Sequence, residues 1–178
     1  MNLAIDVDGV CADLMPVWLK HYNTEFSDDL TSEKITHWDI ENFVKPECGK
    51  KIFSYLDVPT LYYEVEPIEG ALAGIETLRK MGHRVIFATS ADVHHGGRKY
   101  DWLVRWGFLN GDRQDMRDYM EVRDKSLINC DLLLDDHAGN LKNFNGSRWL
   151  FDCHHNQDVE SIYFRVYGWK DAASRINY

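Results

Sequence analysis

Short apolar runs recur along the chain, separated by longer segments in which apolar residues keep a helical spacing. A short, bounded apolar run is typical of a strand that is buried on both faces of a parallel sheet. Such runs, together with one stretch that also favours a strand, predict strands at residues 3–5, 85–88, 119–122, 132–134 and 149–151.

The helical spacing predicts the segments that connect these strands. Helices are expected at residues 13–22, 70–81, 100–106 and 161–169, with further helical structure from Lys170 onward. Gly82 and Gly107 are typical helix stop signals. Apolar strands that alternate with helices imply an α/β fold, in which a doubly wound parallel sheet carries helices on both faces and forms a three-layer core.

Residues 23–66 have a different character. They are aromatic, acidic and rich in turn residues, with short helical patches such as 49–56 and no strand-length run of β-branched residues. This pattern indicates an insertion, placed after the first strand, that packs over another part of the molecule.

Composition narrows the class of protein. A chain of 178 residues with 44% hydrophobic and 13% aromatic residues suits one packed domain with a small insertion. The net charge of −9 argues against an extended nucleic acid as partner, because that would need a positive surface. The chain has no long apolar stretch and its first residues lack a basic leader, so we expect a cytoplasmic protein without a membrane partner. A homodimer is compatible with the sequence.

Polar side chains follow three of the predicted strands at the point where each strand ends. In an open parallel sheet, ligands bind outside the carboxyl ends of the strands. The sequence therefore predicts one site built from Asp6 and Asp8 after the first strand, Thr89 and Ser90 after the second, Asp135 and Asp136 after the fourth, and Lys125 from the segment before that strand.

These residue types suit phosphoryl transfer. Asp6 and Asp136 are candidate ligands for Mg²⁺, which favours carboxylate oxygens, and Asp6 also offers an oxygen that can attack phosphorus and form an aspartyl-phosphate. Lys125 can stabilise the negative charge, and the Thr89 hydroxyl can bind a non-bridging phosphate oxygen. Asp8 can protonate the leaving oxygen and later activate water.

The combination resembles the haloacid-dehalogenase superfamily of phosphatases. Its first motif, Asp-x-Asp-Gly-x, is matched by residues 6–10, its second by Thr89, and its lysine and acidic pair by Lys125 and 135–136. The resemblance implies that Asp6 is the nucleophile and Asp8 the acid/base. It also implies that Mg²⁺ binds Asp6, the Asp8 carbonyl and Asp136, with Asp135 in support.

Longer stretches resemble one family within that superfamily, the 5'(3')-deoxyribonucleotidases of the cytosolic and mitochondrial type. They are residues 6–13, 63–71, 88–90, 123–125, 131–136 and 153–157. The resemblance implies hydrolysis of deoxynucleoside monophosphates. It makes residues 15–66 a small helical cap over a core formed by 1–14 and 67–178. It also makes Trp38 the best match to an aromatic residue that grips the base, the alternative being that Trp38 only packs the cap.

The chain departs from the family pattern at Leu14, His37, Ala91 and the pair His137-Ala138, without losing a catalytic group. Three alternatives therefore stay open. The first is a phosphatase of the same fold that acts on a sugar phosphate or a nucleic-acid 3' phosphate. The second is a non-catalytic binding module. The third is a phosphotransferase that shares the aspartyl-phosphate.

Three further features carry less weight in the sequence. The pair at 94–95 is expected to be an exposed loop, and Arg123 is either a phosphate contact or part of a surface ion pair. Residues 153–155 contain cysteine and histidine, but a single short cluster lacks the spaced pairs of a structural zinc site.

Overall fold

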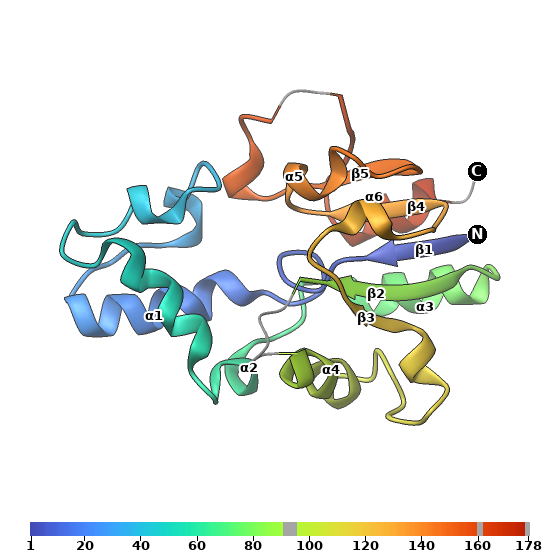
Figure 1. Cartoon of the computed structure of the whole chain (residues 1–178), viewed down its shortest axis with the longest axis horizontal. Coiled ribbons are helices and arrows are strands. Elements are labelled where there is room, and N and C mark those ends of the chain that lie inside the picture. Colours follow the sequence, from blue (N-terminus) through green and yellow to red (C-terminus); the bar gives the residue numbers. More distant parts are fainter. Residues whose placement is uncertain (91–95, 160–161, 177–178) are drawn as a thin grey trace.

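A six-stranded parallel sheet forms the centre of the computed structural model, which describes residues 1–90, 96–159 and 162–176 (Figure 1). The strand order is β3-β2-β1-β4-β5-β6. The strands are β1 (Asn2–Ile5), β2 (Arg84–Thr89), β3 (Tyr119–Glu121), β4 (Leu132–Asp135), β5 (Ser147–Phe151) and β6 (Phe164–Val166). The predicted parallel sheet is confirmed.

The strand order reverses beside β1. The chain moves outward from β1 to β2 and β3, and then returns to place β4 on the other side of β1. Leu3 consequently pairs with Val85 on one side and with Leu132 on the other. Ligands in open α/β sheets bind at such a reversal, outside the carboxyl ends of the strands. The sheet therefore points to the ends of β1 and β4.

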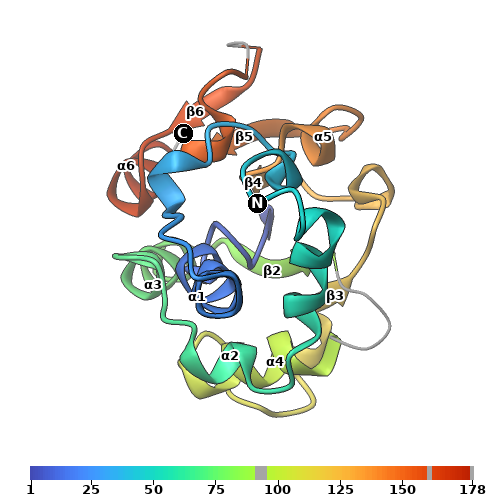
Figure 2. The same cartoon turned by 90° about the vertical axis from the view of Figure 1, so that its left-hand side faces the viewer.

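Helices cover both faces of the sheet, with α3 and α6 on one side and α5 on the other (Figure 2). The helices of this part are α3 (Ala71–Lys80), α4 (Gly96–Arg105), α5 (Ala138–Leu141) and α6 (Trp169–Arg175), with short 3₁₀ helices at Asp115–Arg117, Lys125–Leu127 and His154–Asn156.

Alternate strand residues supply two hydrophobic clusters, one on each face. Leu3 and Ile5 of β1 pack in the cluster under α3, α4 and α6, whereas Ala4 packs with Leu133 and Leu141 on the opposite face. This alternation follows from the two-residue period of a strand, and it produces the three layers expected from the sequence.

A third hydrophobic cluster lies within the segment that follows β1. The elements of this segment are α1 (Leu14–Phe26), 3₁₀ helices at Ser32–Lys34, Ile40–Asn42 and Gly49–Asp57, and α2 (Leu61–Glu64). The buried side chains of the third cluster include Leu19, Tyr22, Ile35 and Ile52. The segment lies beyond the carboxyl ends of the strands (Figure 1). It contains no strand among its residues, as predicted, and the cap boundaries at 15 and 66 remain a prediction.

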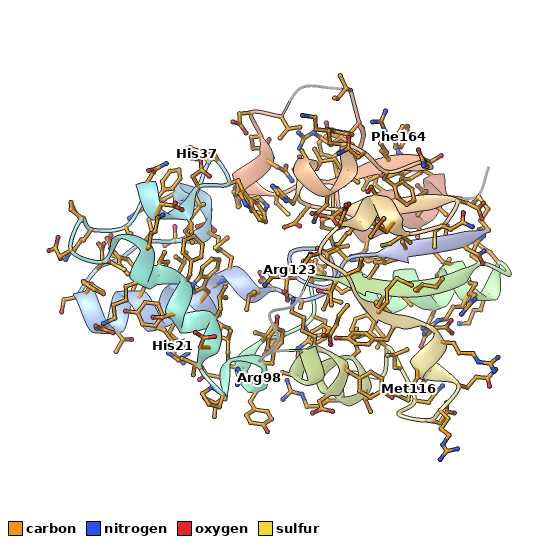
Figure 3. The ribbon with its side chains drawn as sticks, in the orientation of Figure 1. His21, His37, Arg98, Met116, Arg123 and Phe164 are labelled. Atoms are coloured by element: carbon orange, nitrogen blue, oxygen red, sulfur yellow. The ribbon has the colours of Figure 1, made fainter. Side chains whose placement is uncertain are left out.

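The two connections of this segment to the sheet lie side by side. The Asp13 amide donates to the Glu66 carbonyl at 2.9 Å, and the Ile68 amide donates to the Cys11 carbonyl at 2.8 Å. Arg98 of α4 adds a link, because its Nη1 donates to the carbonyls of Asp57 and Val58 (Figure 3).

The prediction of a helix over 161–169 is wrong. Residues 164–166 form β6, which pairs parallel with β5 through Phe151 and Val166. Phe164 and Val166 follow a strand period, but the run is so short that only the neighbouring strand reveals it. The tail is helical as expected, since α6 begins at Trp169. Within the described part of the chain, the helices are too short or too polar to cross a membrane.

The contact between α3 and α6 predicts the effect of one methyl group. A Cβ added at Gly74 would lie 2.4 Å from Cε3 of the buried Trp169, so we expect Gly74→Ala to lower the free energy of unfolding by about 1–3 kcal/mol. Gly97→Ala is the matched control, because a Cβ there meets nothing within 4 Å. Urea denaturation of both variants checks this, and equal stabilities would contradict the packing.

Candidate active site

The loop after β1 lies directly against the end of β4. The Asp6 amide donates to the Leu134 carbonyl at 2.9 Å, which continues the pairing of the two strands by one residue. Gly9 has a φ of +72°, and a Cβ there would lie 2.0 Å from Oδ2 of Asp136. Glycine is therefore required at position 9 for two reasons: the backbone conformation and the close approach to Asp136.

Lys125 connects two of the predicted carboxylates. Its Nζ lies 2.9 Å from Oδ1 of Asp6 and 2.5 Å from Oδ2 of Asp135, and its side chain is fully buried. Asp135 also accepts hydrogen bonds from the His137 amide at 2.9 Å and from Nδ2 of Asn140. The oxygens of Asp135 thus already have partners, which suits the supporting position that the sequence indicates.

Burial has the largest effect on the pKa values of the three carboxyl groups, Asp6, Asp135 and Asp136. It raises the pKa of Asp6 to about 6, although Lys125 opposes the shift. Burial likewise raises the pKa of Asp135 and of Asp136. For Lys125, burial by itself lowers the pKa, but Asp6 and Asp135 outweigh it and hold the pKa above its ordinary value.

The three carboxylates form a group that fits a divalent cation. Oxygens of Asp6, Asp135 and Asp136 lie within 4.8 Å of one another at the switch point of the sheet. Three acids face one lysine here, and a negatively charged group lined by oxygens suits a hard divalent cation. Asp135 is engaged at both oxygens by Lys125 and Asn140. Asp6 is contacted at Oδ1 by Lys125, and Asp136 at Oδ2 by Nε2 of His155, so each has its other oxygen to offer among the described contacts.

A second set of contacts surrounds Asp8 and Thr89. Thr89 ends β2 and is buried, while Ser90 is exposed and its hydroxyl donates to the Val122 carbonyl at 3.3 Å. Lys99 of α4 lies between Asp8 and Thr89, with its Nζ 2.7 Å from Oδ2 of Asp8 and 3.0 Å from Oγ1 of Thr89. Tyr62 donates its hydroxyl to Oδ1 of Asp8 at 2.7 Å.

Sequence reasoning missed both Lys99 and Tyr62. A signal for Lys99 existed, because it precedes the core residues Trp102 and Leu103 by three and four positions and so lies on the buried face of its helix. A lysine on such a face is rarely buried unless it is paired. Tyr62 carries no comparable signal, since a buried tyrosine is ordinary in a core.

A cleft of about 1380 Å³ opens between the inserted segment and the ends of the strands. Its walls include Asp6, Asp8, Thr89, Asp136 and Trp38. Lys125 and Asp135 are buried behind these residues. The structure thus brings together, at one sheet edge, the acids, hydroxyls and lysine that the sequence assigns to a single site.

Trp38 reaches from the inserted segment to the core. Its ring stacks on His137 with centroids 3.8 Å apart and an interplanar angle of 15°, and it meets His155 edge-on at 5.3 Å. The side chain is still 52% exposed. His137, a departure from the family pattern, therefore contacts the residue that the resemblance places at the base.

The remaining sequence features are placed as follows. Arg123 is exposed and lies between the sheet and the inserted segment in projection (Figure 3). The pair at 94–95 lies outside the described residues. Cys153 and His155 approach Asp136, and ligand atoms of the three lie within 4.8 Å of one another.

The sheet and the inserted segment give the chain a haloacid-dehalogenase-like fold. A haloacid dehalogenase-like protein from Streptococcus pneumoniae matches it with a TM-score of 0.64 and 10% identity over 97% of each chain. A hydrolase from Pseudomonas syringae matches with a TM-score of 0.58 and 16% identity, over 99% of this chain and 97% of the other.

The sequence comparisons identify the family. The family model for "5' nucleotidase, deoxy (Pyrimidine), cytosolic type C protein" matches residues 1–177, and the chain belongs to this family. A 5'(3')-deoxyribonucleotidase from Clostridium acetobutylicum is 34% identical over 96% of this chain and 92% of its own length. A 5'(3')-deoxyribonucleotidase from Bacillus subtilis is 28% identical over 98% of this chain and 97% of its own length. The chain is thus a phosphoric monoester hydrolase of the 5'-nucleotidase type.

The buried position of Lys125 predicts a stability loss that depends on pH. Lys125→Met leaves two buried carboxylates without their cation, so we expect the free energy of unfolding at pH 8 to fall by about 3–5 kcal/mol. The pKa of Asp6 is already raised from 3.8 to about 6, and losing Lys125 raises it further. Protonation at lower pH relieves the cost, so the loss should shrink at pH 5.5.

Urea denaturation in EDTA at both pH values measures this effect. Lys142→Met, at an exposed lysine, is the control and should change stability little at either pH. A loss for Lys125→Met of the same size at pH 8 and pH 5.5 would contradict the role of the buried carboxylates.

Proposed function

We propose that the chain is a Mg²⁺-dependent phosphatase that hydrolyses deoxyribonucleoside 5'(3')-monophosphates to a deoxynucleoside and phosphate through an aspartyl-phosphate. One observation carries the proposal: the acidic group at Asp6 and Asp136 and the exposed ring of Trp38 line the same cleft. The family membership supports a nucleotide phosphate as substrate. The name of the relatives, 5'(3')-deoxyribonucleotidase, supports a deoxynucleotide as substrate.

The first half of the reaction forms a bond between Asp6 and phosphorus. A carboxylate oxygen of Asp6 attacks phosphorus, and the bond from phosphorus to the nucleoside oxygen breaks. The Asp8 carboxyl gives its proton to that oxygen, so the nucleoside leaves as an alcohol. Lys125, which contacts Oδ1 of Asp6, holds the nucleophile in place and offsets its charge. The Thr89 hydroxyl and Ser90 bind the phosphate oxygens.

The second half returns the site to its starting state. Asp8, now a carboxylate, takes a proton from water as the water oxygen attacks phosphorus, and the bond to Asp6 breaks to release phosphate. Asp6, the Asp8 carbonyl and Asp136 would hold Mg²⁺, with Asp135 fixed behind them by Lys125 and Asn140. When bound, the cation neutralises phosphate oxygens and so lets an anionic nucleophile approach.

Trp38 supplies the platform for the base in this proposal. A base that stacks on an aromatic ring gains about 1–3 kcal/mol. One face of Trp38 is taken by His137, so the base would use the opposite face. In this proposal the partner is a small phosphate ester in the cytoplasm. Such a partner fits a chain of net charge −9, because lysines at the site supply positive charge locally.

A substrate panel tests the proposal. Phosphate release in Mg²⁺ is measured with deoxy- and ribonucleoside 5'- and 3'-monophosphates, sugar phosphates, a 3'-phosphorylated oligonucleotide and an aryl phosphate. We expect the deoxynucleotides to have the highest kcat/KM, with activity abolished by EDTA and by Asp6→Asn. Preference for another ester would keep the mechanism and reject the substrate. No release from any ester would reject the enzyme in favour of a binding module.

The position of Trp38 predicts a change that depends on the substrate. Trp38→Ala should raise KM for the preferred nucleotide by about tenfold or more, because it removes the stacking energy, while KM for the aryl phosphate changes little. Tyr63→Ala, at an exposed tyrosine outside the cleft lining, is the control. Equal increases for both substrates would mean that Trp38 only packs the inserted segment on the core.

A further inference from the structure

Lys99 is a buried cation at the centre of the Asp8 and Thr89 contacts. Its side chain is 8% exposed, and among the described residues its Nζ has three oxygen partners within 3.0 Å. They are Oδ2 of Asp8 at 2.7 Å, Oγ1 of Thr89 at 3.0 Å and the Ser90 carbonyl at 2.6 Å. A cation in such a position needs compensation for its burial, and these three oxygens provide it.

The number of donors determines what Lys99 can do. An ammonium group carries three N–H donors and no acceptor. Because the three oxygens match the three donors, Lys99 has no donor left for a phosphate oxygen. Lys99 therefore acts on the site through Asp8 and Thr89 and not by binding the phosphate itself.

The direction of these hydrogen bonds orients both neighbours. Oγ1 of Thr89 must accept from Lys99, so the Thr89 hydroxyl hydrogen is left to point elsewhere, into the cleft that Thr89 lines. The Asp8 carboxyl group is held from two sides, by Lys99 at Oδ2 and by the Tyr62 hydroxyl at Oδ1. These two contacts fix the orientation of the group.

The helix that carries Lys99 is itself firmly anchored. Trp102 and Leu103, on the same face of α4, are buried in the main cluster, and Nε1 of Trp102 donates to the Val65 carbonyl at 2.9 Å. A residue whose own position is set by packing can hold a reacting group to within a fraction of an ångström. Lys125 stands in the same relation to Asp6 on the other side of the loop.

We propose that Lys99 is the positioning residue of the acid/base step, which holds Asp8 at the leaving oxygen and turns the Thr89 hydroxyl toward the phosphate. The inference rests on the proposed function, because it assigns the proton of the leaving group to Asp8. In the step that Lys99 serves, the bond from phosphorus to the leaving oxygen breaks as that oxygen takes the Asp8 proton. Lys99 keeps its own protons throughout.

Two substrates with different leaving groups isolate this role. A nucleoside leaves as an alcohol and needs a proton, whereas 2,4-dinitrophenolate leaves without one. The value of kcat/KM reports only the steps up to departure of the leaving group, so later attack by water does not affect it. Lys99→Met should lower kcat/KM by about 100-fold or more for the preferred nucleotide, the order expected for general acid catalysis. The loss with 2,4-dinitrophenyl phosphate should stay below about tenfold.

A double-mutant cycle shows whether Lys99 acts through Asp8. Asp8→Asn alone should give the same selective loss on the nucleotide, and the double variant should be no worse than Asp8→Asn. Lys142→Met controls for the loss of a lysine and should leave both substrates unaffected. Lys99→Gln, which keeps a neutral donor, serves if the methionine variant does not fold, and it should show the same selective loss on the nucleotide, smaller than that of Asp8→Asn.

The outcomes separate the two proposals. Equal losses on both substrates for Lys99→Met, or additive losses in the cycle, would overturn the positioning role while leaving the mechanism at Asp8 intact. An Asp8→Asn variant without leaving-group selectivity would overturn the acid role of Asp8 and, with it, the inference about Lys99. Thermal unfolding of each variant distinguishes these cases from a loss of folded protein.

Discussion

The ion-pair contacts of Lys125 are the interaction on which the site depends. Its ammonium lies fully buried between Asp6 and Asp135, and without it two carboxylates would be buried at one sheet edge with no cation between them. Taking such charges out of water costs several kcal/mol each unless close partners compensate. Burial still raises the pKa of Asp6 to about 6. The site is therefore short of positive charge, which is the condition that a divalent cation relieves.

The rest of the core holds this edge in place. The strand order reverses between β1 and β4, so the loop carrying Asp6 and the end of β4 carrying Asp136 meet directly. Gly9 permits the approach because it has no Cβ. From behind, Nε1 of Trp169 in α6 donates to the Val10 carbonyl at 2.7 Å. The packing of α6 on α3 is thereby coupled to the geometry of the loop that follows β1.

The inserted segment supplies the other wall of the cleft and its aromatic surface. It has a hydrophobic cluster of its own, and its contacts with the core include the paired connections near Asp13 and Glu66, the Arg98 link, the Tyr62 hydrogen bond to Asp8, and the stacking of Trp38 on His137. In the proposed function, the core carries the groups that act on phosphate, and the inserted segment adds the Tyr62 contact to Asp8 and the exposed ring of Trp38.

The pattern of apolar and polar residues in the sequence predicted the parallel sheet and the grouping of the candidate site residues, because residues that follow parallel strands share one edge of the sheet. It could not reveal β6, whose short run becomes a strand only through pairing with β5. It did not reveal Lys99 or the stacking of Trp38 on His137, since both join segments far apart in the chain. The local spacing of apolar residues indicates which face of a helix or strand is buried. Which buried side chains meet, and therefore which carboxylate each lysine holds, was decided only by how helices and strands pack in three dimensions.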